Sequence, residues 1–172
     1  MSDKRLYHFS ETPDIVQFEP RKLYVRDDEP AAVWVIDDDH APHYFFPRDC
    51  PRVCIWPQAD TTAADLERFF GHTATTRIIA VESGWLDRIR TVRLYRYTFA
   101  ADPFELHDAN AGYYTATVPV EPIAVDLMDD LLGRIASRNI ELRVTPSLIP
   151  LKEAILNSTV NFSMIRMRNA KG

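Results

Sequence analysis

The chain has 172 residues, with 20 Lys and Arg against 25 Asp and Glu, and apolar types make up 46% of it. A chain of this length usually forms one domain that buries about 70% of its unfolded-chain surface, and the composition excludes wholesale disorder. No apolar run approaches the roughly 20 residues that span a bilayer, and no secretory signal stands at the start. The formal net charge of −5 argues against general nucleic-acid binding. With only two cysteines, we expect one cytoplasmic domain, residues 1–172, with reduced thiols and no membrane association.

Short runs rich in β-branched and aromatic residues predict about eight strands. The clearest run is 93–100, where Leu94, Arg96 and Thr98 alternate with three aromatic side chains. This period of two is typical of a strand with one aromatic face. The other predicted strands are 5–9, 32–37, 52–56, 77–82, 113–118, 140–145 and 160–168.

About three helices are predicted between these strands. One starts at Thr62, in a pattern similar to a capping box, and stops before Gly71. A second spans 126–139, with aspartates at its start, arginines at its end and a buried stripe that begins at Leu127. A third, short helix follows Ser147. Strands and helices without regular βαβ alternation predict an α+β fold with one mixed, mostly antiparallel sheet.

The densest polar segment is 37–52, which connects two predicted strands. Functional groups concentrate on such connections because a scaffold fixes them while solvent reaches them. Within and just after it, His40 and His43 are three residues apart, and Cys50 and Cys54 are four apart, so zinc is an alternative. The cysteine spacing is wider than the usual C-x2-C turn, and a small buried thiol is normal within an apolar strand. We therefore expect no metal, and the zinc alternative stays open.

Arg48 and Arg52 stand in the same segment, on either side of Asp49 and beside prolines. A guanidinium on a rigid loop suits a phosphate or carboxylate ligand, because it offers two parallel hydrogen bonds. The alternative is a structural ion pair between either arginine and Asp49. The pattern therefore predicts either an anion-binding loop or an internally paired one.

Two further residues could carry chemistry. His8 lies within the first predicted strand, where it is either a hydrogen-bonded core residue or a group that grips a ribose diol. Glu121 ends another strand among turn residues, where it is either a surface charge or a reactive carboxylate. Neither a Walker loop nor G-x-G-x-x-G appears, and no G-x-S-x-G marks a nucleophile.

The segments Leu6–Glu11, His40–Val53 and Phe162–Ala170 resemble a group of uncharacterised bacterial proteins, a domain of unknown function. The resemblance covers nearly the whole chain. It brings no assigned activity with it.

The strand around Tyr7-His8-Phe9-Ser10 also resembles the ADP-ribosyltransferase superfamily, whose first strand carries a histidine that grips the ribose of NAD. This resemblance implies an NAD-binding transferase with His8, Tyr44 and Glu121 as its catalytic residues. His8 would fix the nicotinamide ribose and Tyr44 would stack on the leaving base. Glu121 would hold the ribose 2′-hydroxyl and favour the oxocarbenium-like state.

The same resemblance implies further contacts to the NAD cofactor. Ser10 would help to hold the ribose, and His43 would lie beside the bound nucleotide. Arg48 or Arg52 would meet the pyrophosphate. His8, Tyr44 and Glu121 would then surround one cleft.

Two other hypotheses belong to different functional classes. In the first, the protein is a non-catalytic binding module for a small anionic ligand or a protein partner, with Trp85 as a possible anchor. In the second, a metal-dependent hydrolase uses His40 and His43 and holds stoichiometric zinc. A homodimer is compatible with aromatic residues at the sheet edge.

Overall fold

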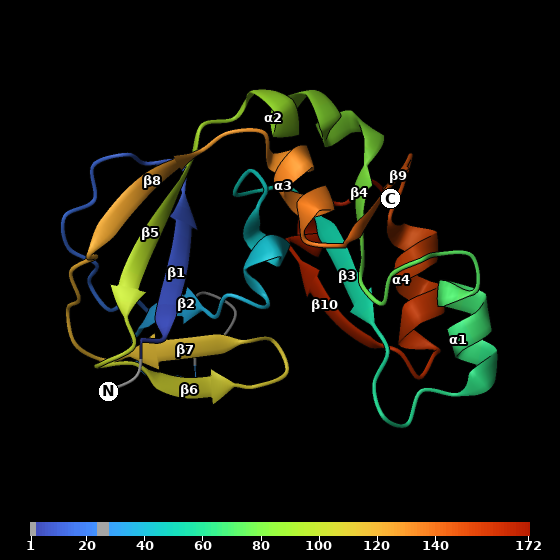
Figure 1. Ribbon diagram of the computed structural model, residues 1–172, viewed down its shortest axis with the longest axis horizontal. Coiled ribbons are helices and arrows are strands. Elements are labelled where there is room, and N and C mark those ends of the chain that lie inside the picture. The colour runs from blue at the N-terminus through green and yellow to red at the C-terminus, as the bar shows by residue number, and fades with distance from the viewer. Residues whose placement is uncertain (1–2, 24–27) are drawn as a thin grey trace. The chain divides into compact units, whose positions relative to one another are not determined.

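The computed structural model describes residues 3–23 and 28–172, and it confirms an α+β fold with mostly antiparallel strands. Two compact units make up the chain (Figure 1). Unit 1 comprises Met1–Phe45 and Arg93–Asp129, and unit 2 comprises Phe46–Val92 and Asp130–Gly172. Each unit contains a sheet of its own, so the strands form two sheets where one was expected. This division does not by itself test the prediction of one domain over residues 1–172.

Unit 1 is built on a six-stranded sheet in the order β6-β7-β2-β1-β5-β8, in which every neighbouring pair is antiparallel. A short 3-10 helix, Ala41–Tyr44, follows β2. The strands are β1 (Arg5–Ser10), β2 (Val33–Ile36), β5 (Leu94–Ala100), β6 (Glu105–Asp108), β7 (Tyr113–Ala116) and β8 (Ala124–Met128).

The two faces of this sheet differ in what covers them. Residues directly opposite each other in an antiparallel pair share a face of the sheet. Leu6 lies opposite Phe99 and His8 lies opposite Tyr97, and we call the face that they share the Leu6 face. Phe18, from the segment after β1, packs on this face with its ring centroid 5.1 Å from that of Tyr97. The other face carries Tyr7 and its neighbours, and we call it the Tyr7 face.

Unit 2 is built on a four-stranded sheet in the order β10-β3-β4-β9, in which only β4 and β9 run parallel. Helices α1 and α4 contribute Phe69 and Ile155 to one apolar cluster with strand residues such as Ile55, so both cover the same face (Figure 1). Helix α3 contacts β9 and α2. The elements are β3 (Arg52–Trp56), β4 (Ile78–Glu82), β9 (Glu141–Thr145), β10 (Asn161–Ile165), α1 (Ala63–Phe70), α2 (Leu86–Thr91), α3 (Leu131–Ser137) and α4 (Ile149–Leu156).

The helices predicted after Thr62 and Ser147 are confirmed. The Thr62 hydroxyl accepts a hydrogen bond of 3.2 Å from the backbone N–H of Asp65, so the cap identified from the sequence is the one used. Helix α4 carries its proline in the first turn, where a missing N–H removes no helical hydrogen bond. Among the described residues, no helix is long and apolar enough to span a bilayer.

The helix predicted over 126–139 is wrong in its first part. Residues Ala124–Met128 form β8 and pair with β5, and the helix begins only at Leu131. Asp130 is its N-cap, and the Asp130 carboxylate accepts a hydrogen bond of 3.2 Å from the backbone N–H of Gly133. Leu127 is therefore not part of a buried helical stripe, and 46% of its surface is exposed. Pairing with β5 provides hydrogen-bond partners for the backbone N–H and C=O groups of this segment. This stabilisation outweighs the weak helix preference of its apolar spacing.

Candidate functional site

His8 lies on the Leu6 face and is half-buried. Its Nδ1 lies 3.1 Å from the backbone carbonyl oxygen of Trp34, and its ring meets that of Phe18 edge to face at 4.9 Å. A carbonyl only accepts hydrogen bonds, so this contact requires a proton on Nδ1. The environment of His8 therefore matches the core alternative given by the sequence, with one ring nitrogen bound to the protein itself.

Glu121 and Ser10 both flank the Leu6 face. Glu121 is exposed, and it directly follows Val120, whose backbone pairs with that of Phe18 in both directions at 2.8 and 3.0 Å. The Ser10 hydroxyl accepts a hydrogen bond of 3.1 Å from the backbone N–H of Thr12. Ser10 thus stabilises the turn that follows β1.

Tyr44 ends the short 3-10 helix, and its hydroxyl lies 2.6 Å from that of Tyr113 on β7. Tyr113 lies opposite Ile36, which lies opposite Tyr7, so this contact is on the Tyr7 face. His43 precedes Tyr44 and is only 1% exposed. A ligand arriving from solvent therefore reaches Tyr44 far more easily than His43.

The transferase hypothesis requires His8, Tyr44 and Glu121 to surround one cleft. His8 lies on the Leu6 face, whereas Tyr44 contacts the Tyr7 face of the same sheet. Glu121 follows a residue that packs on the Leu6 face. The structure therefore separates Tyr44 from His8 by the thickness of the sheet, and it does not bring the three side chains together.

Asp37 and His40 form a hydrogen-bonded pair at the end of β2. The Asp37 carboxylate accepts from both the backbone N–H and the Nδ1 of His40, each at 2.8 Å. Burial alone would raise the pKa of Asp37, but the hydrogen bonds from His40 outweigh it and hold the pKa below its usual value. Gly112 lies against the pair with a φ of +76°, and a Cβ there would lie 2.4 Å from the His40 Nδ1. Only glycine fits this position without displacement.

The cysteines are buried on and beside β3. Burial raises the pKa of both Cys50 and Cys54 to about 12, so neither is a reactive thiolate at neutral pH. Among the described residues, no three His, Cys, Asp or Glu side chains gather in a way that could hold a metal ion. The arrangement thus offers no support for the zinc hydrolase hypothesis.

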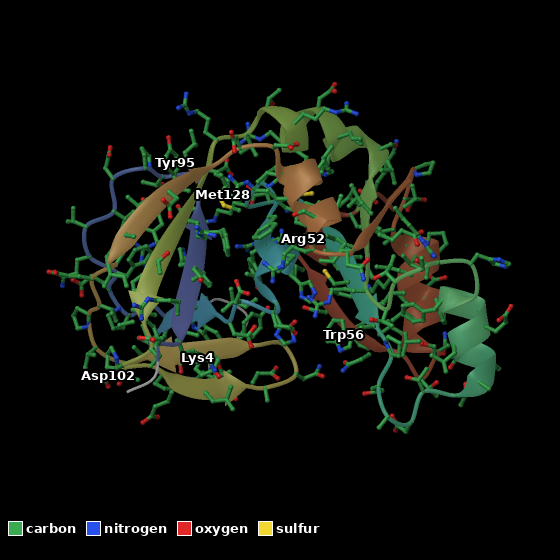
Figure 2. The ribbon with its side chains drawn as sticks, viewed as in Figure 1. Lys4, Arg52, Trp56, Tyr95, Asp102 and Met128 are labelled. Carbon is green, nitrogen blue, oxygen red and sulfur yellow. The ribbon has the colours of Figure 1, made fainter. Side chains whose placement is uncertain are left out.

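Arg52, labelled in Figure 2, is the first residue of β3 and is only 2% exposed. Its guanidinium donates a hydrogen bond of 2.8 Å to the backbone carbonyl of Cys50 and lies 5.4 Å from the ring centroid of Phe46. The sequence left open whether this arginine binds a ligand or pairs internally. The hydrogen bond to the Cys50 carbonyl shows that Arg52 supports the loop that carries Arg48.

Arg48 is exposed on the turn between Phe46 and β3. The Nε of Arg166 donates a hydrogen bond of 3.2 Å to the Arg48 carbonyl, and the Asn169 amide donates one of 2.8 Å to the Asp49 carbonyl. Two distant segments of the chain therefore lie side by side, and both carry arginines. We call Arg48, Arg166 and the exposed Arg168 the basic surface.

Glu82 connects the C-terminal segment to the rest of unit 2 through hydrogen bonds. It ends β4 and is only 3% exposed. Its carboxylate accepts hydrogen bonds from the backbone N–H of Leu148 at 2.9 Å and from that of Lys171 at 2.9 and 3.0 Å. Glu82 thus caps the start of α4 and binds the chain three residues after Arg168.

The two units differ in charge. Unit 1 contains 16 Asp and Glu against 7 Lys and Arg, a formal net charge of −9, whereas unit 2 contains 9 against 13, a net charge of +4. The overall value of −5 conceals this contrast. An anion is therefore attracted to unit 2 and repelled by unit 1.

Sequence reasoning named Arg48 but missed its neighbours. The predicted strand 160–168 includes Arg166 and Arg168, but β10 ends at Ile165. Arg166 instead adopts a φ of +57°, which turns the chain toward Arg48. No local pattern signals Glu82 as a buried carboxylate, since it simply ends an apolar strand.

Comparison with known proteins identifies one relationship. The model of a protein family described as a family of unknown function (DUF6886) matches residues 7–170. Searches of curated proteins and of solved structures give no significant match. No relationship to the ADP-ribosyltransferases is therefore shown.

Proposed function

Since the chain belongs to DUF6886, a family to which no activity is assigned, its function has to be inferred from its own residues, and we propose that it is a non-catalytic binding module for a small anionic ligand. The ligand would bind at the basic surface of unit 2. The observation that carries this proposal is the hydrogen bond between Arg166 and the Arg48 carbonyl, which brings two arginine-bearing segments together.

The rigidity of this surface supports the proposal. The turn that carries Arg48 is bounded by Pro47 and Pro51. The buried Arg52 donates a hydrogen bond to the Cys50 carbonyl of this turn. The segment that carries Arg166 and Arg168 is hydrogen-bonded at both ends. Arg166 donates to the Arg48 carbonyl, and the backbone N–H of Lys171 donates to the Glu82 carboxylate. Arginines on fixed backbone lose less conformational entropy when they bind an anion, which favours affinity.

The charge of unit 2 and the solvent exposure of its arginines also support anion binding. Arg48 and Arg168 are exposed, and unit 2 has a net charge of +4. Guanidinium groups bind phosphate and carboxylate through paired, charge-assisted hydrogen bonds. A compact polyanion such as pyrophosphate is therefore the most direct probe of the surface.

The test is a calorimetric titration with inorganic pyrophosphate at low ionic strength. We expect saturable binding that weakens at least about tenfold in Arg48→Gln or Arg168→Gln, corresponding to about 1.4 kcal/mol. Arg90→Gln is the matched control, because Arg90 belongs to the same unit, lies on α2 and is 57% exposed. Equal weakening in all three variants would indicate only a general charge effect and would contradict the proposal.

The same titration with NAD separates the proposal from the transferase hypothesis. NAD binding that disappears in His8→Ala but persists in Arg48→Gln would favour a site on the Leu6 face. NAD binding through its pyrophosphate at the basic surface would show the opposite pattern.

A further inference from the structure

Unit 1 carries a group of aromatic side chains on the Tyr7 face that the proposed anion site does not use. Three of its members, Trp34 on β2, Tyr113 on β7 and Tyr44 at the end of the 3-10 helix, are half-buried, so each keeps part of its surface in solvent. His107 on β6 completes the group, and 29% of its side chain is exposed. We call these four residues the aromatic cluster.

The rings of the aromatic cluster stand nearly at right angles to one another. Trp34 meets His107 with ring centroids 4.6 Å apart at 71° and meets Tyr113 at 5.9 Å and 85°. Tyr113 meets Tyr44 at 6.2 Å and 70°. The hydrogen bond between the two tyrosine hydroxyls fixes the last pair. In each of these edge-to-face pairs, the edge of one ring points toward the electron-rich face of its neighbour.

Acidic side chains lie beside the aromatic cluster. The Glu29 carboxylate lies 3.3 Å from the Nε2 of His107, with 27% of its own side chain exposed. Glu105 and Asp108 are on the same short strand as His107, and unit 1 as a whole has a net charge of −9. Such surroundings repel an anion and attract a cation.

From this combination we propose that the aromatic cluster binds a small organic cation that carries a methylated ammonium group. The faces of indole and phenol rings attract cations through their quadrupoles. A methylated ammonium fits better than a primary amine, because it is weakly hydrated and needs no hydrogen-bond acceptors from the rings. Glu29 supplies the long-range attraction. All four residues belong to unit 1, whereas the basic surface belongs to unit 2.

The test follows the three indole N–H signals of the ¹⁵N-labelled full chain by NMR during titration with choline at constant ionic strength. Substitution of each tryptophan in turn by Phe assigns the signals. We expect a saturable shift of the Trp34 signal, while those of Trp56 and Trp85 stay unchanged. The neutral isostere 3,3-dimethyl-1-butanol has the same shape without the charge, and it should shift the Trp34 signal at least tenfold less at equal concentration.

Two variants probe the charge without removing a ring. Glu29→Gln keeps the shape of the side chain and should raise the dissociation constant for choline about three- to tenfold. Asp14→Asn is the matched control, because Asp14 is an exposed carboxylate of the same unit in the segment after β1, and it should change the constant less than twofold. Equal responses to choline and its isostere, or no saturable shift of the Trp34 signal up to 100-fold excess over the protein, would overturn the proposal.

Discussion

Replacing Glu82 tests whether one buried carboxylate holds the C-terminal segment in place. Glu82 accepts hydrogen bonds from the backbone N–H groups of Leu148 and Lys171, and the side chain is almost fully buried. In Glu82→Ala both N–H groups lose their acceptor. Leu148 is 0% exposed, so water cannot readily replace the carboxylate there, whereas Lys171 is exposed and water can.

The size of the effect follows from these two environments. A hydrogen bond to a charged group contributes about 1.5–3 kcal/mol, and a buried N–H without a partner costs about 1–3 kcal/mol. We expect Glu82→Ala to lower the free energy of unfolding by about 3–4 kcal/mol, most of it from Leu148. Glu82→Gln keeps one carbonyl acceptor and should lower it by about 1–2 kcal/mol.

A double-mutant cycle isolates the Lys171 contact. Lys171→Pro removes the N–H and should cost about 1 kcal/mol in the wild-type background and close to nothing in Glu82→Ala. Lys171→Ala keeps the N–H and is the control. The assay is urea unfolding followed by the fluorescence of Trp56 and Trp85, which both lie in unit 2. A loss below about 1 kcal/mol in Glu82→Ala, or equal costs of Lys171→Pro in both backgrounds, would refute the reasoning.

Three further predictions concern unit 1 and the thiols. Gly112→Ala should lower the free energy of unfolding by about 2–4 kcal/mol in urea titrations, because its Cβ would meet His40 and its φ is positive, whereas Gly84→Ala meets nothing within 4 Å and should be nearly neutral. Asp37 has a lowered pKa in the folded state, so its stabilising contribution is present above the unfolded-state value and is lost as the pH falls through the folded one. The stability difference between wild type and Asp37→Asn should therefore shrink between about pH 5 and pH 2, and an unchanged difference would contradict the assignment. With pKa values of about 12, the two thiols should stay unreactive toward iodoacetamide at pH 8 until the protein is unfolded, and rapid labelling of the folded chain would refute their burial.

The parts of the fold that the sequence predicted correctly are those set by local chemistry. Thr62 caps α1 because its hydroxyl reaches an N–H three residues ahead, and a proline opens α4 because it suits the first turn. The strand 94–100 shows its period of two because Tyr97 and Phe99 are buried in the core of unit 1, while Arg96 and Thr98 are only half-buried.

The parts that the sequence did not predict depend on distant partners. Residues 126–128 belong to the helix predicted over 126–139, yet they lie in β8 and pair with β5. The short strand β6 has little apolar character and is defined by its pairing with β7. The division of the strands into two sheets depends on pairings that no local pattern encodes.

The candidate site shows the same contrast. Arg48 was identifiable because a proline-bounded loop with arginines is a local signal. Its contact with Arg166 was not, because 117 residues separate the two and the connection depends on a positive φ at Arg166. The opposite placement of His8 and Tyr44 likewise follows from strand register, which only the folded sheet reveals.

The most direct test of the anion-binding proposal follows all backbone amide signals of the full chain by NMR while inorganic pyrophosphate is added. We expect saturable shifts confined to residues 47–52 and 166–171, which carry the basic surface, and no shifts in β1. An absence of saturable shifts, or shifts centred on His8 and its neighbours, would contradict it.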